Sequence, residues 1–404
     1  MINIIGLGYI GLPTALMLAS AGNEVVGTDY NENLVNTLKN NELTFEEPGL
    51  DKLFDTAIEK GITFTSEYQS TDFYIITVPT PYDKDNKKLD PSYVINATKK
   101  VLEVCKKGTL LVIESTISPG TIDKYVRPLI EDSSFKIDED IFLVHAPERI
   151  LPGQMIYELK HNSRTIGADN RDAANRVRNV YSTFCEGEIV CTDIRTAEMT
   201  KVVENTFRGI NIAFANELTK IARHDNLDVH EIIRIANMHP RVNILSPGPG
   251  VGGHCIPVDP WFLVGDYPRL TKLISTALEI NESMPDMVLS RIKDIMKKNN
   301  IKDYNKVGIY GLTYKADVDD IRESPTIQLF ENMEAHFANP FRVYDPMIKD
   351  KIMDNQELNF QKFLEESDII VLMVEHTHLI ENLDSLEGKV VLDTHNLIKS
   401  AYKL

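Results

Sequence analysis

A glycine pattern at the end of the first apolar run constrains the fold more than any other feature of the chain. Residues 1–11 read MINIIGLGYIG, so Gly6, Gly8 and Gly11 form a G-x-G-x-x-G motif between a β-branched run and the helical sequence LPTALMLASAG. A second β-branched run follows and ends at Asp29. Strand, glycine turn, helix and acidic strand end together predict a Rossmann-type βαβ unit.

The chemistry of this unit predicts its ligand. The glycines allow a tight turn and let a pyrophosphate approach the backbone at the helix N-terminus, where the helix dipole favours negative charge. The carboxylate of Asp29 would accept hydrogen bonds from the adenosine ribose and would repel a 2′-phosphate, so we expect NAD rather than NADP. Thr80 in VPTP and Thr116 in EST end later strands of the same sheet, where they either contact a ligand or cap the strand.

Alternating short apolar runs and helical patterns occur in the first part of the chain and return near its C-terminus. This alternation predicts parallel sheets covered by helices. KVGIYGLTY, FRVYDP and SDIIVLMV follow one another in the same order as INIIGLGYI, EVVGTDY and TDFYIITV in the first part. The weak repeat predicts a second Rossmann-like domain. Its Gly308 and Gly311 do not complete the glycine signature, so it should bind a different ligand, if any.

The sequence between the two repeats is helical. From Arg195 to about Asn226 it contains no proline, which predicts one long connecting helix. A shorter helix is expected around 230–237, followed by the Pro/Gly-rich loop HPRVNILSPGPGVGGHCIPVDP and a helical stretch over 270–298. The predicted fold class is α/β, with two Rossmann-like doubly wound parallel-sheet domains joined by a long central helix and a helical middle domain.

Composition excludes several classes of partner. The chain has 404 residues, enough for more than one domain, and a formal net charge of -17, which disfavours binding to nucleic acids and anionic membranes. No apolar run approaches the roughly 20 residues of a membrane span, and the first residues contain no basic region typical of a signal peptide. The cysteines form no CxxC pair, so we expect reduced thiols and a cytoplasmic protein.

Cys255 lies in the glycine-rich segment GPGVGGHCIPVDP, where an open backbone would let a substrate approach the thiol. The residue is either a nucleophile or a small buried hydrophobe. The adjacent His254 has no second ligand pair at a suitable spacing, so no metal is expected.

Polar residues also share one face of the predicted long helix. Lys201, Asn205 and Arg208 stand at i, i+4 and i+7, and they form either a solvated stripe or the lining of a cleft. Apolar residues such as Phe207 fill the adjoining face, which favours a helix packed within the molecule. A lysine and an asparagine one turn apart can stabilise an oxyanion.

From end to end, the chain resembles the UDP-glucose/UDP-N-acetylmannosamine 6-dehydrogenase family. GLGYIGLP, ESTISPGT, HAPER, AEMTKVVEN, GGHCIPVDP and GLTYKADVDDIRESP occur in that family's order. HAPERILPG, HPRVN and PGPGVGGHCIPVDPWF are more similar to the UDP-N-acetylmannosamine branch than to the UDP-glucose branch, which typically has an aromatic residue or Ser before the Cys and Lys before the Asp. The resemblance therefore implies an N-acetylated sugar nucleotide.

The resemblance also implies roles for individual residues. The implied catalytic set comprises the nucleophile Cys255, the oxyanion ligands Lys201 and Asn205, Asp259 near the thiol, and Glu148 and Thr116 around the hydrolytic water. The implied UDP-sugar ligands are Arg149, Ile150, Lys201, Asn205, Arg208, His239, Arg241, Gly252, Tyr314, Lys315 and Lys399. The implied NAD ligands are Gly6, Gly8, Tyr9, Ile10, Gly11, Asp29, Thr80, Thr116 and Arg322.

Departures from the family pattern affect two details. The stretch YNENLV after Asp29 lacks a basic residue that some members have there for the adenosine side. In relatives the arginine equivalent to Arg241 can reach the neighbouring subunit's site, and the sequence leaves open which site it serves here. The family resemblance and the apolar long helix lead us to expect a homodimer.

The expected activity is a double oxidation without release of the aldehyde. The C6 alcohol of a UDP-N-acetylhexosamine, foremost UDP-N-acetyl-D-mannosamine, would become a uronate through a thiohemiacetal and a thioester on Cys255, for surface polysaccharide synthesis. The expected domains are an NAD-binding domain (1–194), a central connector and dimerisation domain (195–300) and a UDP-sugar-binding domain (301–404).

Several alternatives stay open. UDP-glucose, UDP-N-acetylglucosamine or UDP-N-acetylgalactosamine is a possible substrate, since their dehydrogenases share related motifs. A one-step NAD-dependent oxidoreductase would use Cys255 only structurally. A non-catalytic nucleotide-sensing protein would form no NADH at all.

Overall fold

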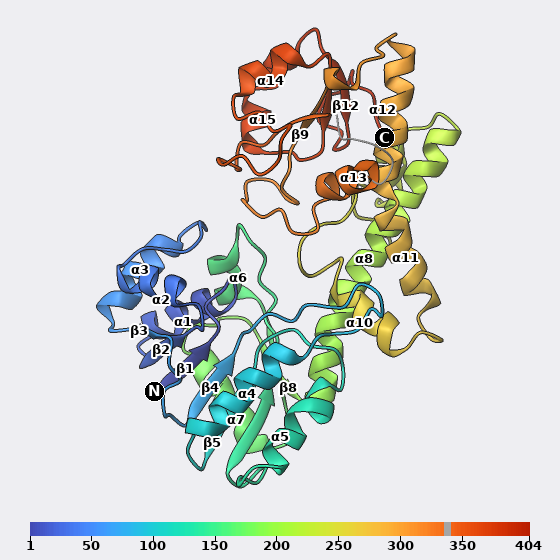
Figure 1. Cartoon of the computed structure of the whole chain (residues 1–404). Coiled ribbons are helices and arrows are strands. Elements are labelled where there is room, and N and C mark those ends of the chain that lie inside the picture. The colour runs from blue at the N-terminus through green and yellow to red at the C-terminus, as the bar shows by residue number, and fades with distance from the viewer. Residues whose placement is uncertain (335–340) are drawn as a thin grey trace. The chain divides into compact units, whose positions relative to one another are not determined.

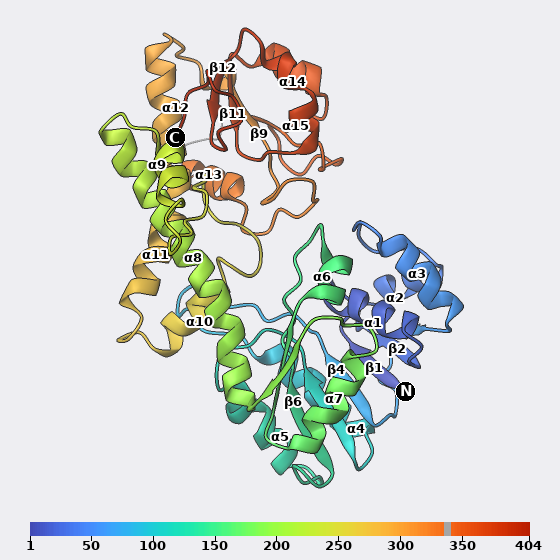
Figure 2. The same ribbon diagram turned by 180° about the vertical axis from the view of Figure 1, so that it is seen from behind.

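Two compact units make up the computed structural model, which describes residues 1–334 and 341–404. The units are Met1–Glu204 and Asn205–Leu404, and the boundary lies inside the 31-residue helix α8 (Ile194–His224). Figures 1 and 2 show that each unit contains its own sheet. The predicted long helix over 195–226 is confirmed, whereas the division into three domains stays a prediction.

An eight-stranded sheet forms the centre of the first unit, in the order β3-β2-β1-β4-β5-β6-β7-β8. Its strands are β1 (Ile2–Ile5), β2 (Val25–Thr28), β3 (Thr63–Thr65), β4 (Phe73–Ile76), β5 (Thr109–Ile113), β6 (Ile141–His145), β7 (Arg164–Ala168) and β8 (Ile189–Thr192). Neighbouring strands are parallel except for the antiparallel pair β6 and β7. The strands predicted before Gly6, Asp29, Thr80 and Thr116 are confirmed as β1, β2, β4 and β5. Strands β7 and β8 were not predicted, because RTIGA and IVCT mix polar and small residues with apolar ones.

Helices cover both faces of this sheet (Figures 1 and 2). They are α1 (Gly11–Ser20), α2 (Glu32–Lys39), α3 (Leu50–Glu59), α4 (Ser92–Val104), the π-helix η1 (Ile122–Val126), α5 (Arg127–Glu131), α6 (Met155–His161) and α7 (Arg171–Tyr181). Successive strand residues point to opposite faces. Ile75 therefore packs with α1 and α3, whereas Tyr74 and Ile76 pack with α4 and α5. This double covering is the predicted doubly wound arrangement.

Helices form the first part of the second unit. After α8 come α9 (Val229–Ala236), α10 (Asp259–Asp266), α11 (Lys272–Glu282) and α12 (Met284–Lys298). The helix predicted around 230–237 is confirmed, and residues 239–258 are irregular as expected. The stretch predicted as helical over 270–298 is two helices with a break at Ser283. Pro285 explains the break, because proline lacks the N–H that would continue α11 and clashes with the preceding turn.

A four-stranded parallel sheet in the order β10-β9-β11-β12 completes the second unit. Its elements are the 3-10 helix η2 (Tyr304–Lys306), β9 (Val307–Tyr310), α13 (Pro325–Glu334), β10 (Arg342–Tyr344), α14 (Phe360–Glu366), β11 (Ile369–Leu372), α15 (Thr377–Glu381), the 3-10 helix η3 (Leu383–Leu386) and β12 (Val390–Asp393). Ile309 packs with α12 and α13, while Tyr310 packs with α14 and α15. The order matches β2-β1-β4-β5, which confirms the predicted repeat.

Within the described part of the chain, no helix combines the length and the apolar composition required to span a bilayer.

Candidate active site

The predicted glycine turn joins β1 to α1. Gly6 adopts a φ of +94°, which favours glycine, and its backbone N–H donates to Thr28 O at 2.8 Å. A Cβ at Gly11 would lie 1.8 Å from Gly6 O and 2.3 Å from Thr77 Oγ1, so only glycine lets the helix start this close to the strand. Among the described residues, no heavy atom lies within 4 Å of a Cβ built at Gly8. The bare backbone there is open to a pyrophosphate.

Asp29 lies at the end of β2, as predicted, and is 8% exposed. Its Oδ2 accepts a hydrogen bond from Leu7 N at 2.8 Å, and its Oδ1 accepts one from Asn31 N at 2.9 Å. Each carboxylate oxygen keeps a second acceptor site, which a ribose hydroxyl can occupy. The carboxylate and the glycine turn together fit a dinucleotide.

Other predicted NAD residues of the first unit lie near these strand ends. Thr80 follows β4 and Thr116 follows β5, and both are half-buried at the carboxyl edge of the sheet. Tyr9 and Ile10 pack against the core beside α1, and the ring of Tyr9 lies 4.4 Å from that of Phe45. Their roles in binding NAD remain predictions.

Glu148 belongs to a buried ionic cluster that the sequence analysis missed. Arg164 at the start of β7 places Nη2 at 2.5 Å from Glu148 Oε2 and Nη1 at 3.3 Å from Glu114 Oε1. The guanidinium also lies 4.5 Å from the ring centroid of Tyr181. The charged residues at the ends of the apolar runs TLLVIE and IFLVHAPE are the sequence signal that could have revealed it, since buried charges occur in pairs.

Burial raises the pKa of Glu114 to about 8 against the opposing effect of Arg164. Near neutral pH, the carboxyl of Glu114 is therefore largely protonated, and the Arg164 guanidinium lies between it and Glu148. This arrangement holds one oxygen of Glu148, while its Oε1 accepts a hydrogen bond from Arg149 N at 2.6 Å. The predicted water ligand is thus fixed in orientation.

Two further predicted sugar ligands of this unit, Arg149 and Ile150, contact other protein groups. Arg149 Nη2 lies 3.0 Å from Glu204 Oε1 and donates to Thr165 Oγ1 at 2.7 Å. Ile150 packs in the core. Lys201 is buried on α8, one helical turn before Asn205.

Glu198, also on α8 and not predicted as a functional residue, holds the turn that follows Thr116. Its carboxylate accepts hydrogen bonds from Gly120 N at 2.5 Å and from Ile122 N at 3.0 Å. Burial raises the pKa of Glu198 to about 7, although these two bonds oppose the rise. The motifs ESTISPGT and AEMTKVVEN are therefore joined through this residue.

In the second unit, asparagines of α8 hold the loop that carries Cys255. Asn205 Nδ2 donates to Asp259 Oδ2 at 2.6 Å. Asn211 accepts from Leu245 N at 2.9 Å, and Asn216 accepts from Gly248 N at 2.9 Å. Irregular backbone needs such side-chain partners, because no neighbouring strand or helix satisfies its polar groups. The sequence analysis identified Asn205 and missed the other two asparagines.

Cys255 is half-buried at the start of a turn that leads into α10. Its carbonyl oxygen accepts hydrogen bonds from Val258 N at 3.1 Å and from Asp259 N at 2.8 Å. Cys255 therefore lies within about one turn of the N-terminus of α10, which begins at Asp259. Asn205 uses one amide hydrogen for the buried Asp259, and an asparagine amide carries a second hydrogen that can donate to another group.

The glycines before Cys255 lie against the loop that follows β9. A Cβ at Gly252 would lie 2.5 Å from Tyr314 Cβ, and one at Gly253 would lie 2.9 Å from the ring of Tyr314. Gly253 N donates to Arg322 O at 2.9 Å, and Arg322 Nη2 lies 3.2 Å from His254 Nδ1. These close approaches require glycine and bring motifs distant in sequence together.

The second unit thus gathers several of the predicted site residues: Asn205, Gly252, Cys255, Asp259, Tyr314 and Arg322. The side chains of Arg208, His239, Arg241, Lys315 and Lys399 are exposed, and their roles in binding a sugar nucleotide remain predictions. Over the described ranges, no group of three or more His, Cys, Asp or Glu side chains is arranged to hold a metal ion.

Family models match most of the chain. Residues 1–185, 195–283 and 308–400 match, respectively, the NAD binding domain, the central domain and the UDP binding domain of the UDP-glucose/GDP-mannose dehydrogenase family.

Individual relatives align over nearly the whole chain. A UDP-N-acetyl-D-mannosamine dehydrogenase of Methanocaldococcus jannaschii is 43% identical, over 98% of this chain and 92% of its own. An NDP-N-acetyl-D-galactosaminuronic acid dehydrogenase of Ralstonia nicotianae is 41% identical, over 98% and 96%. The solved structure of a UDP-N-acetyl-mannosamine dehydrogenase from Staphylococcus aureus is 42% identical, with a TM-score of 0.88 over 99% of this chain and 95% of its own.

Proposed function

Because the chain belongs to the UDP-glucose/GDP-mannose dehydrogenase family, we propose that it oxidises the C6 alcohol of a UDP-N-acetylhexosamine to a carboxylate through Cys255. NAD is the cofactor, since residues 1–185 match the family's NAD binding domain. The proposed sugar is N-acetyl-D-mannosamine, which names the substrate of relatives at 42% and 43% identity. The observation that carries the proposal is the contact of Asn205 with Asp259, directly beside the Cys255 turn.

Bound NAD supplies the hydride acceptor for both oxidations. After the first oxidation, the thiolate of Cys255 attacks the C6 aldehyde, forming a C–S bond and an oxyanion. The second N–H of Asn205 and the ammonium of Lys201, one turn apart on α8, stabilise this oxyanion. Loss of the remaining C6 hydride gives a thioester. Water then breaks the C–S bond and releases the carboxylate, so each turnover consumes two NAD and one water.

Further residues support these steps. Asp259 holds the amide of Asn205 in place. Glu148 and Thr116 position the hydrolytic water, and the orientation of Glu148 is fixed by Arg164. Nucleotide recognition falls to the predicted ligands Arg149, Ile150, Arg208, His239, Arg241, Gly252, Tyr314, Lys315 and Lys399. The 301–404 segment serves as the UDP-sugar domain, and 195–300 serves as the connector.

The stoichiometry of NADH formation tests the activity. NADH release is recorded with UDP-glucose, GDP-mannose and the UDP derivatives of N-acetylmannosamine, N-acetylglucosamine and N-acetylgalactosamine. Two NADH per sugar support the covalent double oxidation, whereas one NADH supports a one-step oxidoreductase. Cys255→Ser should abolish carboxylate formation, and the matched control Cys191→Ser should retain it. Full turnover by Cys255→Ser would refute the nucleophile assignment, and absence of NADH from every substrate would refute the activity.

The N-acetylgalactosamine nucleotide is the second candidate substrate, because a relative at 41% identity is a dehydrogenase named for N-acetyl-D-galactosaminuronic acid. The two sugars differ in configuration at ring carbons and not at C6, so the chemistry at Cys255 would be the same. The ratio of their kcat/KM values decides between them.

We also propose a homodimer formed through α8. Phe207, Phe214 and Ile221 recur at seven-residue intervals along this helix and are 67%, 48% and 55% exposed. A sustained apolar stripe of this spacing is typical of helix pairing. Ile221→Glu should therefore produce a monomer in sedimentation experiments. The control Ile235→Glu removes an isoleucine with a similar exposure, 53%, on α9 and should remain dimeric. If both variants behave alike, the stripe is not the interface.

A cytoplasmic location and a role in surface polysaccharide synthesis follow from the proposed substrates. Sugar nucleotides and NAD are cytoplasmic metabolites, and uronates built on UDP are precursors for glycan assembly. Deletion of the gene should deplete a uronate from surface glycans. In cells that keep the gene, the dehydrogenase activity should be recovered from the cytoplasmic fraction of a lysate.

A further inference from the structure

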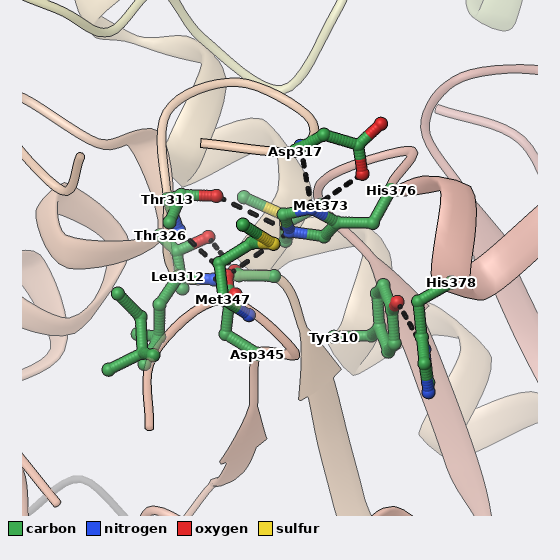
Figure 3. Close-up of polar contacts among 12 residues, drawn as sticks. Tyr310, Leu312, Thr313, Asp317, Thr326, Asp345, Met347, Met373, His376 and His378 are labelled. Atoms are coloured by element: carbon green, nitrogen blue, oxygen red, sulfur yellow. Dashed lines mark hydrogen bonds and ion pairs between the residues drawn. The ribbon is translucent and has the colours of Figure 1, made fainter. Parts of the chain in front are cut away.

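A buried histidine joins the strand ends of the second sheet (Figure 3). His376 is fully buried and lies between β11 and α15. Asp345 follows β10, and the segment 313–317 follows β9. Because these strands are parallel and adjacent, their carboxyl ends lie at one edge of the sheet. His376 contacts both of the other segments at this edge.

The hydrogen bonds of His376 define its tautomer. Asp317 N donates to Nδ1 at 3.0 Å, so Nδ1 is the unprotonated nitrogen and Nε2 carries the proton. Nε2 lies 3.2 Å from Asp345 Oδ2 and 3.3 Å from Thr313 Oγ1. The imidazole therefore links the backbone of Asp317 to the carboxylate of Asp345.

The carboxylate of Asp345 is a fixed anchor for this link. Its Oδ2 also accepts from Leu312 N at 2.6 Å and Thr313 N at 3.0 Å, while its Oδ1 accepts from Met347 N at 2.8 Å. Burial alone would raise the pKa of Asp345, but the hydrogen bonds from His376 and the backbone outweigh it and lower the pKa below its ordinary value.

The segment 313–317 is shaped by these contacts. Asp317 has a φ of +58°, a conformation that residues other than glycine adopt at a cost. Its carboxylate accepts hydrogen bonds from Thr377 N at 2.9 Å and Thr377 Oγ1 at 2.6 Å, next to His376. Thr313 Oγ1 donates to Lys315 O at 3.0 Å. Both ends of the segment are therefore tied to His376 or its neighbour.

The same segment supports the Cys255 loop. Tyr314 lies against Gly252 and Gly253, since a Cβ built at these glycines would lie 2.5 Å and 2.9 Å from its side chain. A shift of the 313–317 backbone would move Tyr314 away from the two glycines, and the Cys255 loop would lose this contact. We infer that His376 is a positioning residue. It holds Tyr314 and Lys315 in place for the UDP moiety, and through Tyr314 it holds the Cys255 loop in place. The part concerning UDP rests on the proposed function.

Three variants test this inference. His376→Leu removes the contacts with Asp317 N, Asp345 and Thr313, whereas His376→Asn keeps an acceptor near the Nδ1 position. His378→Leu is the control, because the hydrogen bond of His378 in the same domain goes to Tyr310 rather than to the 313–317 segment. The probes are UDP in calorimetric titration, and iodoacetamide for the alkylation rate of Cys255.

We expect His376→Leu to weaken UDP binding and raise the KM for the sugar nucleotide by about tenfold or more, with the KM for NAD unchanged. It should also change the rate of Cys255 alkylation. His376→Asn should recover most of the UDP affinity, and His378→Leu should match the wild type within about threefold. Equal effects of His376→Leu and His378→Leu on UDP affinity and alkylation would overturn the inference.

Nitrogen-15 NMR of the histidine-labelled wild type gives a test that needs no variant to fold. The spectrum should show His376 protonated at Nε2 only, and protonation at Nδ1 would overturn the inference. If the wild type oxidises no sugar nucleotide, the proposed function fails. The tautomer and the alkylation rates then still decide whether His376 holds the loop.

Discussion

Replacing Glu114 by glutamine should remove a pH dependence from the stability of the first unit. Glu114 is fully buried beside Arg164, and burial raises its pKa to about 8 from an ordinary value near 4.5. Between these values the folded protein binds a proton that the unfolded chain has released. Stability therefore falls as the pH rises through this window. The stabilising contribution of Glu114 is fully present only below the unfolded pKa. Glutamine has the shape of the protonated acid and does not titrate.

The magnitude follows from this displacement of the pKa. One pH unit inside the window changes the free energy of unfolding by about 1.4 kcal/mol, so Glu114 accounts for a loss of up to about 4 kcal/mol between pH 5 and pH 8. At pH 5, Glu114→Gln should differ little from the wild type, because the folded Glu114 is neutral there and pH 5 lies only just above its unfolded pKa. At pH 8 the variant should be the more stable protein by up to about 4 kcal/mol.

Urea unfolding followed by far-UV circular dichroism at several pH values measures this difference. Hydrogen exchange in a peptide covering β5 assigns the transition to the first unit. The exposed Glu139 provides the control, since Glu139→Gln should leave the pH profile of the wild type unchanged. Parallel profiles for the wild type and Glu114→Gln from pH 5 to pH 8 would refute the raised pKa of Glu114.

Further substitutions probe the cofactor turn, the thiol loop and the water ligand. Gly11→Ala should lower the melting temperature, because the alanine Cβ would lie 1.8 Å from Gly6 O. Gly8→Ala should keep the melting temperature and weaken NADH binding at least about tenfold in a fluorescence titration. Asp259→Asn should lower kcat about 100-fold in the NADH assay with little change in KM, since it loses the charge that holds Asn205. Arg164→Met should destabilise the first unit by about 3–5 kcal/mol in urea. The same variant should accumulate a sugar adduct on Cys255, visible by intact mass, because Glu148 is no longer fixed.

The elements that the sequence predicted well are those with local signals. Apolar runs predict β1, β4 and β9 to within a few residues, and the proline-free stretch does the same for α8. The glycine turn was equally clear, because each glycine meets a steric requirement that other residues fail. The repeat added long-range order, since it matched one sheet to the other.

The contacts that the sequence did not predict join residues far apart in the chain. Arg164 meets Glu114 across 50 positions, and His376 meets Asp345 across 31. Only the sheet order brings these strand ends together, and this order was not deduced from the residues. The break at Ser283 is different, because Pro285 was visible in the sequence and its effect on the helix was overlooked.

The acidic residues that end the second strand of each repeat show how the two sheets have come to differ in function. Asp29 keeps acceptor sites beside the open glycine turn and is 8% exposed. Asp345 occupies the corresponding position after β10, but backbone amides and His376 surround its carboxylate, leaving it 3% exposed. A ribose hydroxyl therefore has access to the first carboxylate and not to the second. In the second domain the carboxylate of Asp345 instead holds the backbone of the loop after β9, through Leu312 N and Thr313 N.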